Sequence, residues 1–316
     1  MLQRVNICPE CNAESIVRKP NGDYVCANCG KKLDDAYLEQ IVNDSHAEPQ
    51  DTVAQFNLGF CYLNGAGVEK DVAEGIRYYT AAAEGGDMYA QYRLGRCFDK
   101  EIGVAMDNFE AALWYRRAAE QGHALAQYRL GLCYEAGLGV TRDMNRAFNY
   151  YKRSAEQNNP FGQTALARCF ARGIGTGKNI VEALHYYQLA AEQDYAPASF
   201  QLGAIYADAV GVEQNMSEAL HWFQKAADKE YPPALTAIGL CYKEGTGVTK
   251  NEAKAVEYLK RAARKGDGKA QYHLGVCYLN GMGVPFSISE AMHWFGRAAE
   301  NGFDEALSFI KRKFKG

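Results

Sequence analysis

The sequence has no run of about 18 apolar residues, the length needed to cross a bilayer, so we expect no transmembrane helix. Its first residues, MLQRVNICPECNAE, lack the apolar core of a signal peptide, and we therefore expect a cytoplasmic protein. No charge dominates, because 35 Lys and Arg residues balance 38 Asp and Glu residues. A net charge of -3 gives no global attraction to nucleic acid or to a membrane surface.

Motifs for catalysis are also missing. We find no Ser/His/Asp arrangement, no Walker loop and no HExxH motif. Three of the six histidines, His185, His221 and His293, stand at one position of a repeat, which marks a helix surface. The sequence therefore predicts a protein that is not an enzyme.

A repeat of constant length is the strongest feature present. The stretch LGFCYLNGAGV at residues 58–68 recurs every 36 residues without insertion or deletion. A segment copied seven times is a structural building block rather than a nucleotide-binding loop. The seven units fill residues 54–305 and begin at Ala54, Ala90, Ala126, Gly162, Ala198, Ala234 and Ala270.

The first half of each unit has the pattern of an α-helix that ends at glycine. Apolar or small residues recur at positions 1, 5, 8, 9 and 12, which form one helical face. A Gly-x-Gly pair follows, as Gly65 and Gly67 in the first unit, and predicts a turn with positive φ. Glu101 and Ala209 replace the first glycine in two units, so the second glycine is the stricter requirement.

A second helix begins a few residues later. Its expected N-caps, which accept hydrogen bonds from free backbone N–H groups, are Asp71, Asp107, Asp143, Asn179, Asn215, Asn251 and Ser287. A glutamate three residues on predicts a capping box in five units, whereas Arg146 and Lys254 break it. Each unit is thus a helix–turn–helix hairpin, and stacked hairpins give an all-α solenoid with one continuous core. Residues 306–316, where Lys311 and Lys313 replace core residues, are expected to form a capping helix.

Six of the ten cysteines occupy one position of the repeat. They are Cys61, Cys97, Cys133, Cys169, Cys241 and Cys277. Equivalent residues on stacked helices lie about 8–10 Å apart, too far for a disulfide. Ile205 stands there in the fifth unit, and it can replace a packing residue but not a metal ligand. We expect buried, reduced thiols.

The other four cysteines predict a zinc module in residues 1–33, which we call the ribbon. Cys8, Cys11, Cys26 and Cys29 form a CxxC-x14-CxxC set that suits one structural zinc ion. The Asn-Gly pair between them predicts a β-hairpin. A redox dithiol and a rubredoxin-type iron site are the alternatives. We expect the ribbon to have a core separate from the solenoid, with residues 34–53 as a short helix (34–43) and a polar linker.

The pattern A-x-x-x-L-G-x-x-Y-x-x-G-x-G-V, followed by WYRRAAEQG, resembles the Sel-one-like repeat, a relative of the tetratricopeptide repeat. The resemblance implies a right-handed superhelix of paired helices and a scaffold or adaptor that binds protein. Some bacterial cysteine-rich relatives have been proposed to bind or hydrolyse β-lactams. They carry two cysteines per unit, whereas this sequence has one, which weakens the comparison. Binding or hydrolysis of β-lactams is therefore only the alternative function.

The resemblance also implies which surface binds a partner. In the related arrays the first helix of each unit lines a concave groove. In units two to four these helices carry six cations with tyrosines between them, namely Arg93, Arg96, Lys100, Arg129, Arg168, Arg172, Tyr92 and Tyr128. We predict a basic and aromatic groove for an acidic peptide, with ordinary solvated surface as the alternative. The ribbon is either a cap, a protein-docking module or, less favoured, a nucleic-acid-binding module. The sequence leaves the oligomeric state open, and we expect a monomer.

Overall fold

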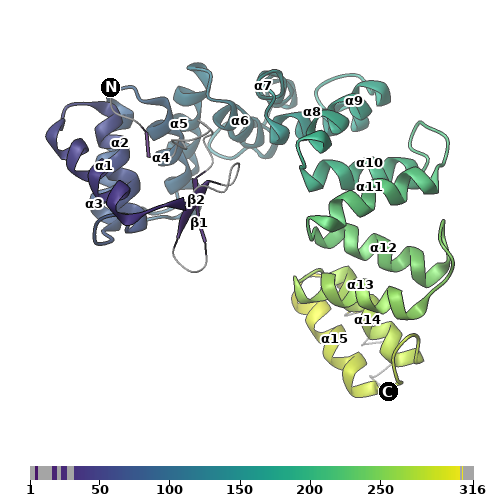
Figure 1. The fold of residues 1–316 in the computed structure, drawn as a ribbon. Coiled ribbons are helices and arrows are strands. Elements are labelled where there is room, and N and C mark those ends of the chain that lie inside the picture. The colour runs from purple at the N-terminus through teal and green to yellow at the C-terminus, as the bar shows by residue number, and fades with distance from the viewer. Residues whose placement is uncertain (1–3, 6–15, 20–22, 27–31, 307, 309–316) are drawn as a thin grey trace. The chain divides into compact units, whose positions relative to one another are not determined.

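The computed structural model describes residues 4–5, 16–19, 23–26, 32–306 and 308. The chain divides into two compact units (Figure 1). The first unit contains residues 1–162 and 174–176, and the second contains residues 163–173 and 177–316. Each unit is described by itself.

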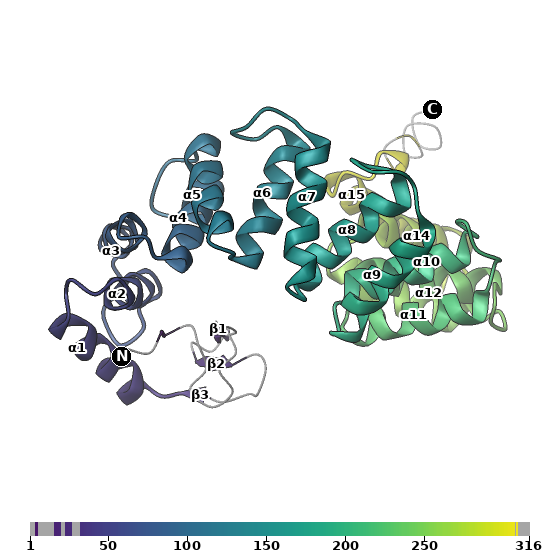
Figure 2. The ribbon, with the colours of Figure 1, turned by 90° about the horizontal axis from the view of Figure 1, so that it is seen from above.

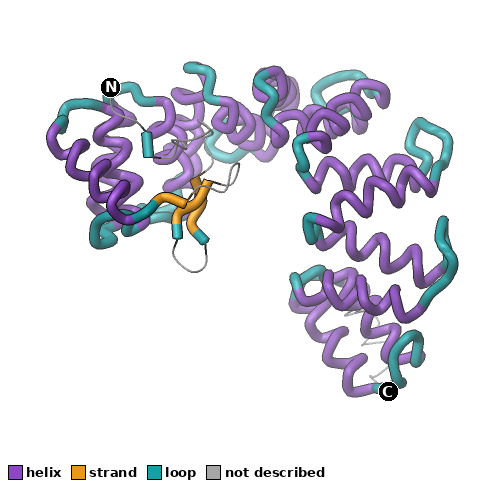
Figure 3. The backbone as a smooth tube through the Cα atoms, in the orientation of Figure 1, coloured by secondary structure: helices purple, strands orange, loops and turns teal. Residues whose placement is uncertain are grey.

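Helical hairpins make up nearly all of the described chain (Figure 3). The ribbon region contains β1 (Ile16–Arg18), β2 (Tyr24–Cys26) and β3 (Lys32–Leu33). The helices are α1 (Asp35–Ala47), α2 (Thr52–Asn64), α3 (Val72–Glu84), α4 (Met88–Lys100), α5 (Asn108–Glu120), α6 (Ala124–Ala136), α7 (Met144–Glu156), α8 (Pro160–Arg172), α9 (Ile180–Glu192), α10 (Ala196–Ala207), α11 (Met216–Asp228), α12 (Pro232–Glu244), α13 (Glu252–Arg264), α14 (Gly268–Asn280) and α15 (Ile288–Glu300).

In the first unit, helices α2 to α7 follow one another in chain order (Figure 2), and each packs on the next. Helices α9 to α15 do the same in the second unit. The predicted solenoid of helix–turn–helix repeats is therefore confirmed.

All seven predicted N-caps of the second helices are confirmed. Each side chain accepts a hydrogen bond from a backbone N–H of the first turn. The reciprocal half of the capping box is replaced, because the N-cap N–H donates to a carbonyl of the preceding helix, as Asp71 does to Tyr62 at 3.0 Å. The third-position glutamate is then free to accept from a tryptophan, as Glu218 does from Trp222 at 2.8 Å.

The two turn glycines differ in their surroundings. The first position has positive φ even where it is not glycine, with φ of 53° at Glu101 and 54° at Ala209. The second position also has positive φ, and atoms of a preceding helix lie close to it. A Cβ atom on Gly139 would lie 1.8 Å from the carbonyl oxygen of Asn108. Backbone contacts below 3.0 Å recur at Gly67, Gly175 and Gly283, whereas side-chain atoms lie closest at Gly103, Gly211 and Gly247. Positive φ together with this crowding favours glycine at the second position.

The segment between the ribbon and the repeats is more helical than expected. Helix α1 runs from Asp35 to Ala47, with Asp34 as its N-cap, and it packs on α2. Leu38, Ile41 and Val42 are buried in the same core as the first repeat. Residues 44–47, three of them polar, continue this helix because its apolar face is already anchored. The predicted capping segment 306–316 lies almost entirely outside the described residues.

Candidate protein-binding surface

The ribbon packs directly on the first repeat. Its three antiparallel strands, in the order β1-β2-β3, place Ile16, Tyr24 and Leu33 in a core shared with Phe56 and Phe60 of α2. The Tyr24 ring meets the Phe60 ring edge-on, at 6.1 Å between centroids. The expectation of a separate ribbon core is therefore wrong. A sheet this small gains its buried surface by packing against the helices.

A second segment of the N-terminal region also lies on this repeat. Val5 is fully buried, and its N–H donates to the buried Asn57 side chain at 2.9 Å. Arg4 forms an ion pair with Asp87, the N-cap of α4. The Arg4 guanidinium also lies 4.5 Å from the centre of the Tyr89 ring. The chain's own N-terminal residues thus cover part of the first repeat and the start of α4.

Most of the predicted zinc ligands lie outside the described residues. Only Cys26 is placed, as the last residue of β2, where it pairs with Ile16 of β1. Among the described residues, no three His, Cys, Asp or Glu side chains gather in a way that could hold a metal. The described strands form the hairpin expected between two CxxC turns, and four thiolates are a donor set that zinc favours.

The structure brings two of the predicted cations to the ribbon. Arg93 and Arg96 of α4 line a cavity of about 240 Å³ together with Ile16 and Tyr24. Phe60, Leu63, Asn64, Tyr79, Cys97 and Ile102 complete the lining. Within the described chain, the Nε–H of Arg96 is buried and has no hydrogen-bond partner. A buried guanidinium donor at a cavity is a natural partner for a carboxylate.

Two acidic residues outside the predicted site lie on helices that carry its cations, α4 and α6. Asp99 accepts a hydrogen bond from the Tyr115 hydroxyl at 3.2 Å and lies 3.6 Å from the Nζ atom of Lys100. Glu135 of α6 accepts from the Tyr151 hydroxyl at 2.5 Å. Both stand at position 10 of the repeat, on the first helix of their unit. They interrupt the predicted basic surface.

The two predicted aromatic residues differ in exposure. Tyr92 is only 6% exposed, because it packs against Tyr115 and stacks on His123 at 4.6 Å between centroids. Tyr128 is half-buried, and its ring lies 5.6 Å from that of Phe161. The Arg129 guanidinium lies 6.0 Å from the Tyr128 ring centre. Tyr128 therefore retains surface for a partner, whereas Tyr92 is mainly a packing residue.

The last two predicted cations belong to the second compact unit. Arg168 is half-buried and Arg172 is exposed, both on the part of α8 that belongs to that unit. Nearby Tyr187 is buried, which raises its pKa to about 12, and the two arginines oppose that rise. A groove that joins them to Arg93 and Arg96 stays a prediction.

The repeated cysteines are buried free thiols, as expected. Burial raises the pKa of Cys61 to about 12 and the pKa values of Cys97 and Cys133 to about 11. Such thiols remain protonated at neutral pH and are weak nucleophiles. They belong to the packing of the solenoid rather than to a reactive site.

His123 is a buried histidine between the predicted groove helices α4 and α6. It is the N-cap of α6, and its Nδ1 atom accepts from the N–H of Ala126 at 3.2 Å. Burial, assisted by the charge of Arg93, lowers the pKa of His123 to about 4. The imidazole is therefore neutral at physiological pH.

Comparison with known proteins matches this architecture. The family model described as Sel1 repeat matches residues 52–87, 89–123, 124–159, 160–195, 196–231, 232–267 and 268–303. The structure is similar to that of a Sel1 repeat protein from Oxalobacter formigenes, with a TM-score of 0.69 and 30% identity over 89% of this chain and 82% of that chain. It is also similar to c5321, a protective antigen of uropathogenic Escherichia coli, with a TM-score of 0.59 and 30% identity over 85% of this chain and 66% of that chain.

More distant likeness extends to yeast Tom70, at 13% identity and a TM-score of 0.52, covering 88% of this chain and 58% of that one. The ribbon region has its own match, because the family model described as TFIIB zinc-binding covers residues 6–44. A stretch of 34 residues is 47% identical to Transcription initiation factor IIB 2 of Thermoplasma acidophilum. That stretch is 10% of this chain and spans only 11% of that protein. None of the helices in the described ranges is long and apolar enough to cross a membrane.

Proposed function

Because this chain belongs to the Sel1 repeat family, we propose that it is a non-enzymatic scaffold whose protein partner binds where the ribbon meets α2 and α4. Solenoids of this kind commonly mediate protein–protein interaction through the extended surface that stacked repeats create. One observation carries the choice of surface. The buried Nε–H of Arg96 has no hydrogen-bond partner in the described chain, and Arg96 lines the cavity below the ribbon.

The chemistry of this cavity favours an acidic side chain flanked by apolar groups. Arg93 and Arg96 supply positive charge, while Ile16, Phe60 and Ile102 supply apolar walls. A carboxylate that enters can satisfy the unpaired donor, and burial strengthens a charge-assisted hydrogen bond. We infer that the partner presents an Asp or Glu within an apolar segment of its chain.

The remaining predicted cations extend this proposal. Lys100 is exposed and Arg129 is half-buried, so both have surface available to a longer segment. Asp99 and Glu135 lie on the same helices, and a uniformly acidic peptide would meet repulsion there. We therefore propose a partner of mixed sequence in place of a polyacidic tract. Arg168 and Arg172 of the second unit stay proposed contacts for a protein partner.

The ribbon's proposed role is to wall the cavity and cap the solenoid, with Cys8, Cys11, Cys26 and Cys29 holding one zinc ion. A structural zinc would fix the turns that flank β1 and β2 and so hold Ile16 and Tyr24 over the cavity. The ribbon's likeness to part of a transcription initiation factor favours a second candidate, a role in transcription that involves nucleic acid. Nucleic-acid binding would fall steeply as salt rises.

The test is affinity capture with the full-length chain, comparing wild type with the double variant Arg93→Glu and Arg96→Glu. We expect the double variant to lose the captured partner, and calorimetry with the identified segment to show at least tenfold weaker binding, equivalent to about 1.4 kcal/mol. Lys243→Glu, the same charge reversal on α12, is the control and should keep the partner. Retention of the partner by a folded double variant, judged by circular dichroism, would rule out this surface.

A further inference from the structure

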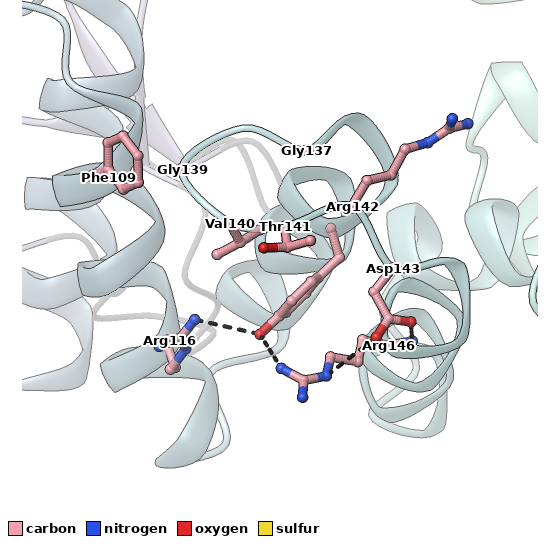
Figure 4. A pocket seen from close by; sticks show the side chains of 10 residues that line it. Phe109, Arg116, Gly137, Gly139, Val140, Thr141, Arg142, Asp143 and Arg146 are labelled. Carbon is pink, nitrogen blue, oxygen red and sulfur yellow. Dashed lines mark hydrogen bonds and ion pairs between the residues drawn. The ribbon is translucent and has the colours of Figure 1, made fainter.

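A second cavity, of about 710 Å³, lies in the first unit (Figure 4). It is formed by α5, by the turn after α6 and by the start of α7. Tyr134 lines it and lies on α6 two residues after Leu132, which stands at the same repeat position as the predicted groove residues Arg96 and Arg168. Two residues turn a helix by about 200°, so Tyr134 faces away from Leu132.

Two arginines converge on one hydroxyl in this cavity. A guanidinium nitrogen of Arg116 and one of Arg146 each lie 3.3 Å from the Tyr134 Oη atom, and their dashed contacts meet there in Figure 4. A phenol oxygen that accepts two hydrogen bonds still has its own O–H to donate. The phenol O–H and the other N–H groups of the two guanidiniums therefore remain available as donors close to this oxygen.

The positive charge of the cavity is only partly balanced. Three arginines and one aspartate are among its lining residues. Asp143 lies 3.4 Å from Arg146, in a solvent-exposed pair that contributes little. Across the described chain, no carboxylate lies within ion-pair distance of Arg116 or Arg142. Guanidinium groups held together around a neutral phenol are the arrangement that binds a compact oxyanion.

The repeat itself makes the cavity unusual. The position of Arg146 is glutamate in five of the other units, namely Glu74, Glu110, Glu182, Glu218 and Glu290. Lys254 is the remaining cation at that position, and Gln224 replaces Arg116 beside it. Only the third unit thus combines a cation at the position of Arg146 with a cation at the position of Arg116 in the preceding unit. Packing of the repeat does not require the pair, since the other units form the same hairpin without it.

We propose that this cavity binds the phosphate group of a phosphomonoester. A tetrahedral dianion can accept hydrogen bonds from Arg116, Arg146 and the Tyr134 hydroxyl together. The rest of the ligand would lie against exposed Phe109, which is 76% exposed and borders the cavity. This site is independent of the proposed protein-binding surface, so either can fail without the other.

The test is calorimetric titration of the full-length protein in chloride buffer with inorganic phosphate and with phenyl phosphate. We expect both to bind, and phenyl phosphate to bind more tightly because its ring can pack on Phe109. Arg146→Glu restores the residue that five other units carry, so the fold should survive, and affinity should fall at least tenfold. Tyr134→Phe has precedents in Phe98 and Phe170, and it should weaken binding several-fold by removing the hydroxyl.

Lys254→Glu is the matched control, because it makes the same change of charge at the equivalent position of the sixth unit. It should leave both affinities unchanged. Equal losses from Arg146→Glu and Lys254→Glu would mean attraction by overall charge and would overturn the proposal. If phenyl phosphate binds no more tightly than inorganic phosphate, the cavity is a site for the free anion and the phosphomonoester proposal is wrong. If neither probe binds, the cavity is not a phosphate site.

Discussion

The Tyr24 hydroxyl of the ribbon donates a hydrogen bond to the backbone carbonyl of Asn64, at the end of α2, over a distance of 3.0 Å. This bond joins residues 40 positions apart, and it attaches the ribbon to the C-terminal end of α2, the first helix of the first repeat. The ribbon is consequently part of the first compact unit in both packing and hydrogen bonding. Unfolding of the ribbon should therefore lower the stability of the helices that it packs on.

Removal of zinc should therefore destabilise the first repeats as well as the ribbon. We expect one zinc per chain by native mass spectrometry, and Cys26→Ser should release it. Calorimetric unfolding of this variant should show a lower midpoint, by roughly 2–4 °C for each kcal/mol lost. Tyr24→Phe is the control. It should keep the metal, and its free energy of unfolding should fall by about 1 kcal/mol because the hydrogen bond to Asn64 is lost. An unchanged midpoint in metal-free Cys26→Ser protein would contradict the shared core.

The two turn glycines offer a paired test of backbone against steric requirement. Gly137→Ala should cost about 1–2 kcal/mol, because φ is +74° and the atom nearest to a new Cβ, the Cβ of Arg142, is as far away as 3.3 Å. Gly139→Ala should cost clearly more, since its Cβ would lie 1.8 Å from the carbonyl oxygen of Asn108. Urea unfolding of both variants measures the difference. Equal costs would show that the turn relaxes freely.

Much of the solenoid could be predicted from the sequence, because its signals are local. An N-cap such as Asp71 acts on residues two or three positions away, and a turn glycine acts on its own φ angle. The helix boundaries follow from these contacts within each 36-residue unit. The stacking follows because every hairpin leaves an apolar face uncovered.

The binding surfaces could be predicted less well, because they depend on contacts between distant segments. Nothing in the pattern around Tyr24 indicates that it packs on Phe60 and covers a cavity with Arg93. The sequence shows that Asp99 is acidic. Its hydrogen bond from the Tyr115 hydroxyl depends on the packing of two helices, which the local pattern does not reveal. For the pair Arg116 and Arg146, the sequence contains one indication, because Arg146 replaces the capping-box glutamate of five other units.

The repeated cysteines should be unreactive in the folded protein. Burial raises the pKa of Cys133 to about 11, so little thiolate forms at pH 8. Iodoacetamide labelling followed by mass spectrometry should modify none of the six in the native state and all of them in urea. Cys133→Ala should lower the free energy of unfolding by about 1–2 kcal/mol, as expected for a small buried side chain. Rapid native labelling of Cys133 would contradict its burial.

The stability of the first unit should depend on pH through His123. Burial lowers the pKa of this histidine from 6.5 to about 4, so between these values the unfolded chain binds more protons than the folded chain. The free energy of unfolding should therefore fall as the pH drops from about 6.5 to about 4, and the contribution of His123 is fully present above that window. The two pKa values limit this loss to about 3 kcal/mol. His123→Asn keeps an N-cap of the kind seen at Asn159 and removes the titration, while His273 still titrates in both proteins. Thermal unfolding measured from pH 7 to pH 4 should thus show the wild type losing stability relative to His123→Asn. Parallel curves for the two proteins across this window would mean that His123 does not stay neutral in the fold.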